Sequence, residues 1–188
     1  MKHKTQFFLS FILIFVSASL FGQTATNDSR FIAKTSIDQA LSGSGDMRLT
    51  RMENALEYRV NRYFTPSVSL AFAKSDQGVY LTTSMIQTNA NLYFSPFRND
   101  RKNDFRIGVG VSGMRVSSFN EDAQFYENGQ YVYSEYEFRQ ENAYGFNVML
   151  EDNYQIAPHI LVGFRLAYQL YNSGDQIIGG GINLGIQI

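Results

Sequence analysis

The chain has 188 residues, no cysteine and a formal net charge of −1 at pH 7. This length suits one domain, and the lack of thiols excludes a disulfide framework, a thiolate metal site and a cysteine nucleophile. A chain without a basic excess also lacks the surface that nucleic acids need, so we expect no nucleic-acid partner.

Residues 1–22 have the features of a cleavable signal peptide. Lys2 and Lys4 form a basic start, residues 7–16 are almost wholly apolar, and small residues precede Gly22. This apolar run is shorter than the roughly 20 residues that a membrane helix needs. We predict export with cleavage after Gly22, which leaves residues 23–188 as the mature domain, with 14 basic against 17 acidic residues and a net charge of −3.

Beyond residue 22, period-two alternation predicts eight strands, and no apolar run is long enough for a membrane helix. In the last strand, Ile182 and Leu184 share one face while Asn183 and Gly185 share the other. The strands are predicted over residues 30–37, 55–64, 68–74, 86–94, 105–112, 144–151, 159–170 and 178–188.

The connections between these strands alternate in character. Residues 65–67, 95–104 and 157–159 form compact connections at one end, and residues 40–50, 75–78, 118–140 and 172–176 connect the strands at the other. This order predicts an all-β fold, an eight-stranded antiparallel up-and-down transmembrane β-barrel with both termini on one side.

A soluble lipocalin-like barrel with an apolar lumen is the rival interpretation. A surface in water normally carries Lys and Glu, yet the polar face here is mostly Gly, Asn, Gln, Ser and Ala, which fit inside a narrow barrel. Aromatic residues also gather at the strand ends, as interfacial girdles require. The two predicted girdles are Tyr63, Phe64, Tyr93, Phe94, Phe97, Phe105 and Tyr154 at one rim, and Tyr80, Tyr144, Tyr168 and Tyr171 at the other.

With its signal peptide, Phe21-Gly22-Gln23 junction and carboxy-terminal strand, the chain resembles the small outer-membrane β-barrel (porin-like) family. It is similar to barrels of the outer-membrane protein A and X type. The resemblance implies a monomer in the bacterial outer membrane that contacts membrane lipid and the outer-membrane insertion machinery. That machinery usually reads a terminal aromatic residue in such families, and Ile188 departs from this pattern.

No motif predicts catalysis, a cofactor or a metal, so we expect a protein that is not an enzyme. The mature chain has one histidine, His159, in a compact turn, whereas a Ser/His hydrolase needs a base beside its nucleophile. The run from Gly108 to Gly113 spells a dinucleotide-binding pattern, but no helix start follows it. We interpret Gly108 and Gly110 as small residues that face the lumen.

The alternation places charged residues inside the barrel, where they are tolerable only if paired. The predicted lumen charge cluster consists of Lys34, Glu57, Arg59, Arg106, Glu151 and Arg165. Asn128-Gly129 is a strong type I′ hairpin signal, and a two-residue loop there sets Arg106 opposite Glu151. A three-residue loop at Pro158 then brings Arg165 to the other side of Glu151. We expect these three residues to close the lumen as a plug.

Residues 118–140 are predicted to continue this register above the membrane as a two-stranded hairpin. The expected cross-strand pairs are Phe119 with Phe138, Phe125 with Val132 and Tyr126 with Tyr131. The segment is acidic, with Glu121, Asp122, Glu127, Glu135 and Glu137 against Arg139. The predicted partner-binding residues are Phe125, Tyr126, Asn128, Gly129, Tyr131 and Tyr133.

We therefore expect a structural and surface-interaction role, in which this hairpin binds an extracellular or envelope protein. Two alternatives stay open. One is a narrow porin-like channel for small solutes, which unpaired basic residues in the lumen would favour. The other is an accessory subunit of an envelope complex.

Overall fold

The computed structural model describes residues 30–43, 47–76, 81–97, 103–127 and 130–188. The predicted signal peptide lies outside these residues and stays a prediction. The described residues form eight strands and no helix long and apolar enough to cross a membrane. The strands are β1 (Phe31–Ser42), β2 (Met47–Tyr58), β3 (Phe64–Asp76), β4 (Leu81–Phe94), β5 (Asn103–Glu127), β6 (Gln130–Ala157), β7 (Ile160–Tyr171) and β8 (Gln176–Gln187).

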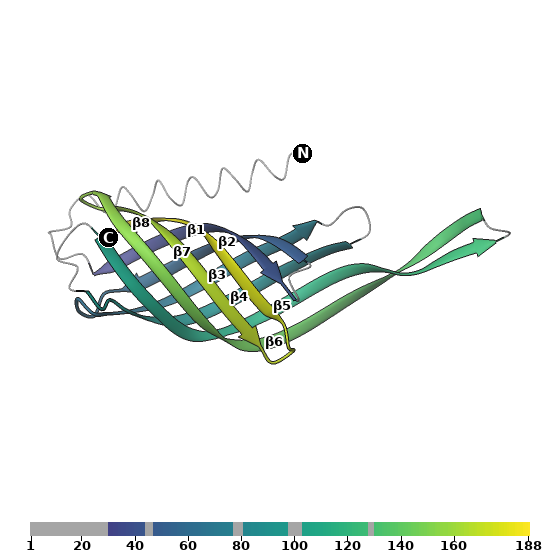
Figure 1. Cartoon of the computed structure of the whole chain (residues 1–188), viewed down its shortest axis with the longest axis horizontal. Helices are drawn as coiled ribbons and strands as arrows, with labels where there is room; N and C mark the ends of the chain where they lie inside the picture. The colour runs from purple at the N-terminus through teal and green to yellow at the C-terminus, as the bar shows by residue number, and fades with distance from the viewer. Residues whose placement is uncertain (1–29, 44–46, 77–80, 98–102, 128–129) are drawn as a thin grey trace.

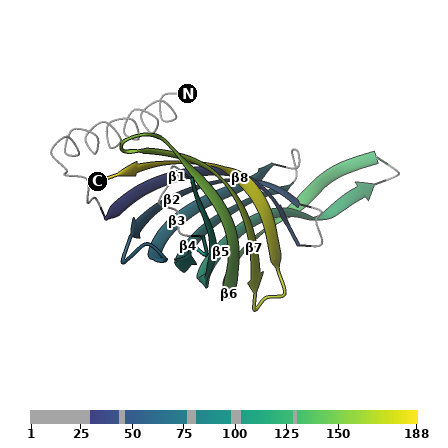
Figure 2. The same cartoon turned by 60° about the vertical axis from the view of Figure 1, so that its left-hand side comes forward.

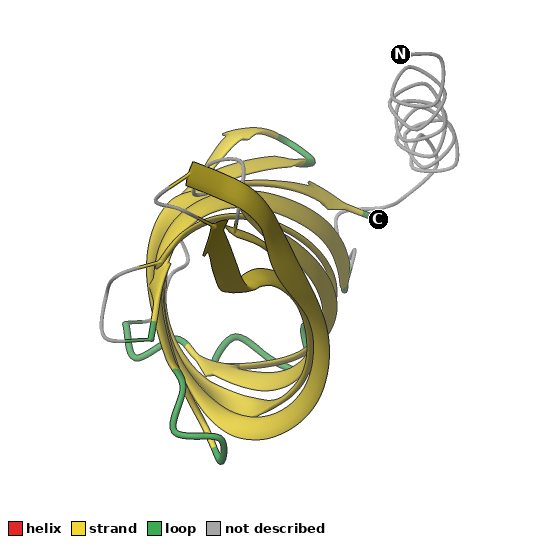
Figure 3. Ribbon diagram, turned by 90° about the vertical axis from the view of Figure 1, so that its right-hand side faces the viewer, coloured by secondary structure: helices red, strands yellow, loops and turns green. Residues whose placement is uncertain are grey.

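Each strand pairs antiparallel with the next in sequence, and β1 also pairs with β8, so the sheet closes into a barrel (Figures 1 and 3). The predicted fold class is confirmed. The start of β1 and the end of β8 lie at one end of the barrel, which we call the terminal end. The β5–β6 hairpin projects from the opposite end, the ribbon end (Figure 1).

The strands of this barrel are staggered. A path that starts at Arg106 on β5 and follows directly paired residues through β6, β7, β8, β1, β2, β3 and β4 returns to β5 at Val116, ten residues nearer the ribbon end. Closure of a tilted sheet requires such a shear. Residues paired in register therefore climb steadily along the barrel axis, and this climb decides which lumen side chains meet.

Several predicted boundaries were wrong near the amino terminus. The expected turn at residues 65–67 lies within β3, and the chain instead turns at residues 59–63, where the Asn61 side chain accepts hydrogen bonds from the N–H groups of Tyr63 and Phe64. Such an Asx turn is a local alternative to a proline-centred turn. Pro66 is tolerated because it lies just beyond the last β2–β3 pair, Glu57 with Ser67.

The wall of the barrel is apolar outside and mostly polar inside. Large apolar side chains such as Val109, Phe146 and Val148 are exposed on the outer wall, while their neighbours in sequence face the lumen. Aromatic rings pack together at the terminal end, where Phe64 and Phe94 lie 5.4 Å apart. Tyr93 and Tyr171 do not belong to the predicted girdles, because both are buried inside the barrel.

Candidate functional site

The β5–β6 ribbon extends well beyond the barrel wall (Figures 1 and 2). β5 pairs with β4 only as far as Asn120, and β6 pairs with β7 only from Gly145. The contact between β6 and β7 continues for one more residue at Asn172. Its side-chain oxygen accepts a hydrogen bond from the Tyr144 N–H, and its backbone N–H donates to the Tyr144 carbonyl. Beyond these limits β5 and β6 pair only with each other. The edge of β6 from residue 130 to residue 143 therefore has no neighbouring strand among the described residues.

The predicted register of this ribbon is confirmed over most of its length. The pairs Arg106–Glu151, Val109–Val148 and Phe119–Phe138 all form. Near the tip, Tyr126 pairs with Tyr131 as expected, but Phe125 pairs with Tyr133 instead of Val132. The cause is two register shifts, between Glu121 and Ala123 and between Phe125 and Tyr126, which offset each other. Asn128 and Gly129 lie outside the described residues.

Most of the described side chains of the ribbon are exposed. Phe119, Tyr133 and Phe138 are large apolar groups on its surface, with Phe138 61% exposed. Arg139 forms a surface salt bridge with Glu137 at 2.7 Å, and the hydrogen bond from Arg139 holds the pKa of Glu137 below its ordinary value. Three further residues of the predicted partner-binding set, Phe125, Tyr126 and Tyr131, lie near the tip of the ribbon, where their backbones pair across β5 and β6.

Inside the barrel, four charged residues near the terminal end form the terminal-side cluster: Lys34, Glu57, Arg106 and Glu151. The Arg106 guanidinium donates to Glu57 at 2.6 and 2.8 Å and to Glu151 at 2.6 and 3.0 Å. Lys34 Nζ lies 3.3 Å from Glu57 and 2.7 Å from Glu151. The Tyr93 hydroxyl donates to Glu151 at 3.1 Å. Two positive and two negative charges are thus mutually neutralised.

A second group, the ribbon-side cluster, lies further along the lumen and consists of Asp38, Arg51, Glu53 and Arg165. Arg165 donates two bonds of 2.9 Å to Glu53 and also bonds Asp38. Arg51 donates from Nε to Asp38 at 3.0 Å, and its Nη1 donates to Gln169 at 2.9 Å. This cluster is also neutral, so the lumen holds no uncompensated charge among these eight residues.

The predicted lumen cluster was therefore right in part. Arg165 pairs in register with Glu151, but its guanidinium bonds Asp38 and Glu53, because the barrel stagger raises it toward the ribbon end. Its register arises from a two-residue turn and a shift between Gln155 and Ala157, not from a three-residue loop.

Arg59 is a second correction. It follows the end of β2, is only half-buried, and takes part in no described salt bridge. Sequence reasoning also missed Asp38, Arg51 and Glu53. They carry the same inward alternation as Lys34 and Glu57, but the first predicted strand ended at residue 37 and the second began at residue 55, so these positions lay between the two predicted strands.

An apolar layer that the sequence analysis missed closes the lumen at the ribbon end. It contains one buried side chain from each of the eight strands, and each is at most 5% exposed. These residues, the apolar plug, are Ala40, Leu49, Ala73, Met85, Met114, Ala143, Tyr171 and Ile177. Because every strand contributes a buried apolar side chain to this layer, the layer opposes the passage of ions or small solutes.

Glycines make this packed interior possible. A Cβ atom on Gly108 would lie 2.6 Å from the buried Tyr93 ring, so the ring occupies the space that a side chain would need. The dinucleotide-like run from Gly108 to Gly113 lies entirely within β5, with no helix after it. No group of residues suited to hold a metal ion occurs in the described part of the chain.

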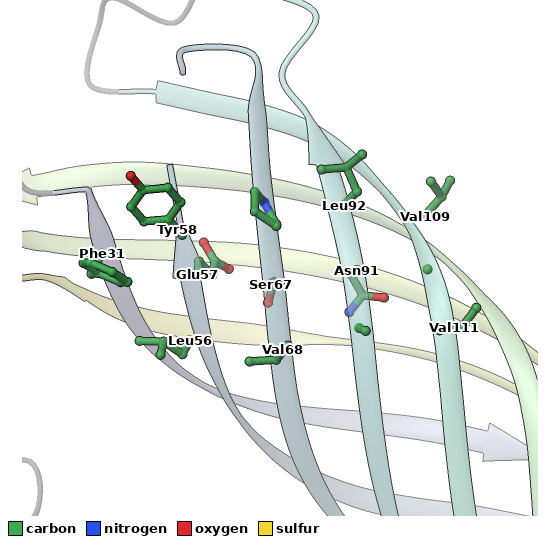
Figure 4. Close-up of a pocket in the computed structure, with 13 residues that line it drawn as sticks. Phe31, Leu56, Glu57, Tyr58, Ser67, Val68, Asn91, Leu92, Val109 and Val111 are labelled. Atoms are coloured by element: carbon green, nitrogen blue, oxygen red, sulfur yellow. The ribbon is translucent and has the colours of Figure 1, made fainter. Parts of the chain in front are cut away.

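Grooves occur on the outer wall of the barrel. One of about 530 Å³ is lined mainly by exposed apolar residues of β2 to β5, among them Leu56, Val68, Leu92 and Val109 (Figure 4). These side chains belong to the face that a membrane barrel turns toward lipid. The groove is thus a feature of the lipid-facing surface.

Comparison with known proteins shows that this chain has the fold of the small eight-stranded outer-membrane β-barrels. Neisserial surface protein A matches with a TM-score of 0.63 and 14% identity over 84% of this chain and 97% of that chain. Ail, the attachment invasion locus protein of Yersinia pestis, matches with a TM-score of 0.55 and 9% identity over 84% and 98%. OprG from Pseudomonas aeruginosa matches with a TM-score of 0.55 and 9% identity over 87% and 100%. No family model and no curated protein sequence matches the chain.

Proposed function

We propose that this protein is an exported, monomeric outer-membrane barrel that acts through its ribbon, residues 118–140, as a surface-interaction protein. The unpaired edge of β6 carries the proposal. An edge strand presents free backbone donors and acceptors, so a partner can add a strand to it. β6 offers this edge over a longer stretch than β5, because β5 remains paired with β4 as far as Asn120.

The interior of the barrel supports a surface role, because its features do not suit a channel. Charges inside it are paired in two neutral clusters, and the apolar plug closes its ribbon end. These features argue against the alternative of a porin-like channel. The names of two proteins with this fold, a surface protein and an attachment protein, agree with a role at the cell surface.

The partner we propose is an extracellular or envelope protein with a basic, extended segment. Glu121, Asp122, Glu127, Glu135 and Glu137 outnumber Arg139 in the ribbon, so the added strand should carry Lys or Arg. Attraction between exposed charges is screened by salt, and the contact should therefore weaken as ionic strength rises.

The test replaces residues 120–137 with a short Gly-Asn turn in the full chain. Chemical crosslinking on intact cells, followed by affinity purification, then compares partners captured by the wild type and by this variant. We expect the variant to insert, to keep the faster gel mobility of an unboiled barrel, and to lose its partner. Capture of the same partners by both proteins would contradict the proposal.

A further inference from the structure

A second pocket lies on the outer wall at the ribbon end, away from the ribbon strands. It has a volume of about 320 Å³ and is lined by Gln39, Arg48, Leu49, Thr50 and Lys74 of β1, β2 and β3. Thr50 lies directly opposite both Gln39 and Lys74 in the sheet. Gln39 donates a hydrogen bond to the Thr50 hydroxyl at 3.1 Å. All four polar side chains are exposed, and Leu49 points the other way into the apolar plug.

The two cations of this pocket have no acidic partner in the described structure. None of the salt bridges between described residues includes Arg48 or Lys74. A third exposed cation, Arg115, lies close to the same row, because Lys74 pairs with Ser84 and Ser84 pairs with Ser117. The described side chains on this side of the rim thus include three exposed cations, in contrast to the acidic ribbon.

The pocket lies at the border of the apolar band. Leu41 is paired with Arg48, and Phe72 precedes Lys74 by two residues on the same face of β3; both apolar side chains are exposed on the wall. Long basic side chains at such a border lay their stems on apolar surface and hold their charged groups at the level of lipid headgroups. Since longer loops of these barrels face outward, the ribbon end corresponds to the outer leaflet.

We propose that this pocket binds the phosphate groups of an anionic glycolipid in the outer leaflet, an inference that rests on the proposed outer-membrane location. A guanidinium binds phosphate through two parallel hydrogen bonds, and an ammonium adds a point charge. The Gln39 amide supplies another donor beside them. The acyl chains lie along the exposed side chains of Leu70 and Phe72.

Lipid phosphate fits this pocket better than free phosphate does. Two exposed cations in water are screened and hold a small anion weakly. A phosphate attached to a membrane lipid is instead delivered at the depth of the pocket, which raises its effective concentration. The arrangement of cations above apolar side chains therefore selects an amphiphilic anion.

The experiment measures binding of fluorescent diphosphorylated lipid A to the full mature barrel in neutral detergent micelles. The Arg48→Gln, Lys74→Gln double variant should bind about thirtyfold more weakly, because each basic contact with an anionic lipid contributes about 1 kcal/mol. The matched control is Arg30→Gln, Arg62→Gln, which removes two exposed positive charges at the terminal end. This control should bind like the wild type, and unboiled gel mobility verifies that both variants fold.

Two further arms separate the sources of phosphate. Lipid A without its phosphates should bind both the wild type and the double variant weakly, and inorganic phosphate should not displace the intact lipid at comparable concentration. Equal binding by the double variant, equal loss in the control, or displacement by inorganic phosphate would overturn the proposal. The barrel with residues 120–137 replaced should keep its lipid affinity, so failure of the ribbon hypothesis and failure of the lipid site can be told apart.

Discussion

Strands β5 and β6 contribute both to the lumen and to the ribbon, yet their residues are paired in opposite ways in the two regions. Inside the barrel, Arg106 on β5 and Glu151 on β6 are paired with each other and with charges from β1 and β2. Beyond the wall, the same strands lose their neighbours, and the β6 edge is left without a strand beside it. A single hairpin thus contributes both to the paired charges of the lumen and to the unpaired edge of the ribbon, and we propose that this edge binds a partner.

The largest loss of stability is expected for a substitution in the terminal-side cluster, where the charges are buried and paired. Glu151→Ala would leave Lys34 and Arg106 with Glu57 as their remaining carboxylate partner. Breaking a buried ion pair by removal of one member costs about 3–5 kcal/mol. We expect the urea unfolding midpoint in detergent to fall accordingly. Glu141→Ala, at an exposed position on the same strand, is the control, and equal midpoints for the two variants would contradict the cluster's structural role.

The apolar plug provides the next test. Leu49→Ala would open a cavity beside its buried neighbours, at a cost of about 2–4 kcal/mol in unfolding free energy. Leu41→Ala, on the outer wall, leaves no internal cavity, so its cost should be smaller. If the two variants unfold at the same denaturant concentration, the plug is not tightly packed.

Planar-bilayer recordings test the plug in another way. The wild type should pass no ions at rest, because an apolar layer with a contribution from every strand lies across the lumen. Steady conductance through the purified wild-type barrel would restore the channel alternative.

Removal of the ribbon should have little effect on stability. Replacement of residues 120–137 with a Gly-Asn turn leaves both ion clusters and the plug intact, so the unfolding free energy should change by less than about 1 kcal/mol. Thermal unfolding, followed by gel mobility, measures this. A large loss would mean that the ribbon stabilises the barrel, and the division between the two regions would fail.

The smallest effect concerns the surface pair on the ribbon. Arg139→Gln removes the hydrogen bond that lowers the pKa of Glu137, so that pKa should rise toward its ordinary value. The contribution of this pair to folding stability is fully present above the ordinary pKa of a glutamate carboxyl. It is lost as the pH falls through the lowered pKa of Glu137. Carboxyl NMR titration measures the shift, and an unchanged pKa would show that Arg139 does not hold Glu137 in solution.

Sequence reasoning succeeded where alternation and a turn signal acted together. Asn128-Gly129 led to the correct pairs for Arg106, Val109 and Phe119. It failed where one turn was assigned to residues 65–67, since that choice moved the second predicted strand to residues 55–64 and left Arg51 and Glu53 outside it. Asp38 was missed because the first predicted strand ended one residue before it. The aromatic residues Tyr93 and Tyr171 were misplaced because composition alone does not separate an inward ring from a girdle ring.

The sequence by itself determined the barrel, because period-two alternation states which side chains face lipid and which face the interior, and a membrane allows only a closed sheet. It also determined local register across one short turn. Only the tertiary structure decided which charges meet, since the stagger of ten residues around the barrel moves Arg165 away from Glu151 toward Asp38 and Glu53. The apolar plug likewise depends on closure, because its eight residues are far apart in the chain and reach one level only when all eight strands are in place.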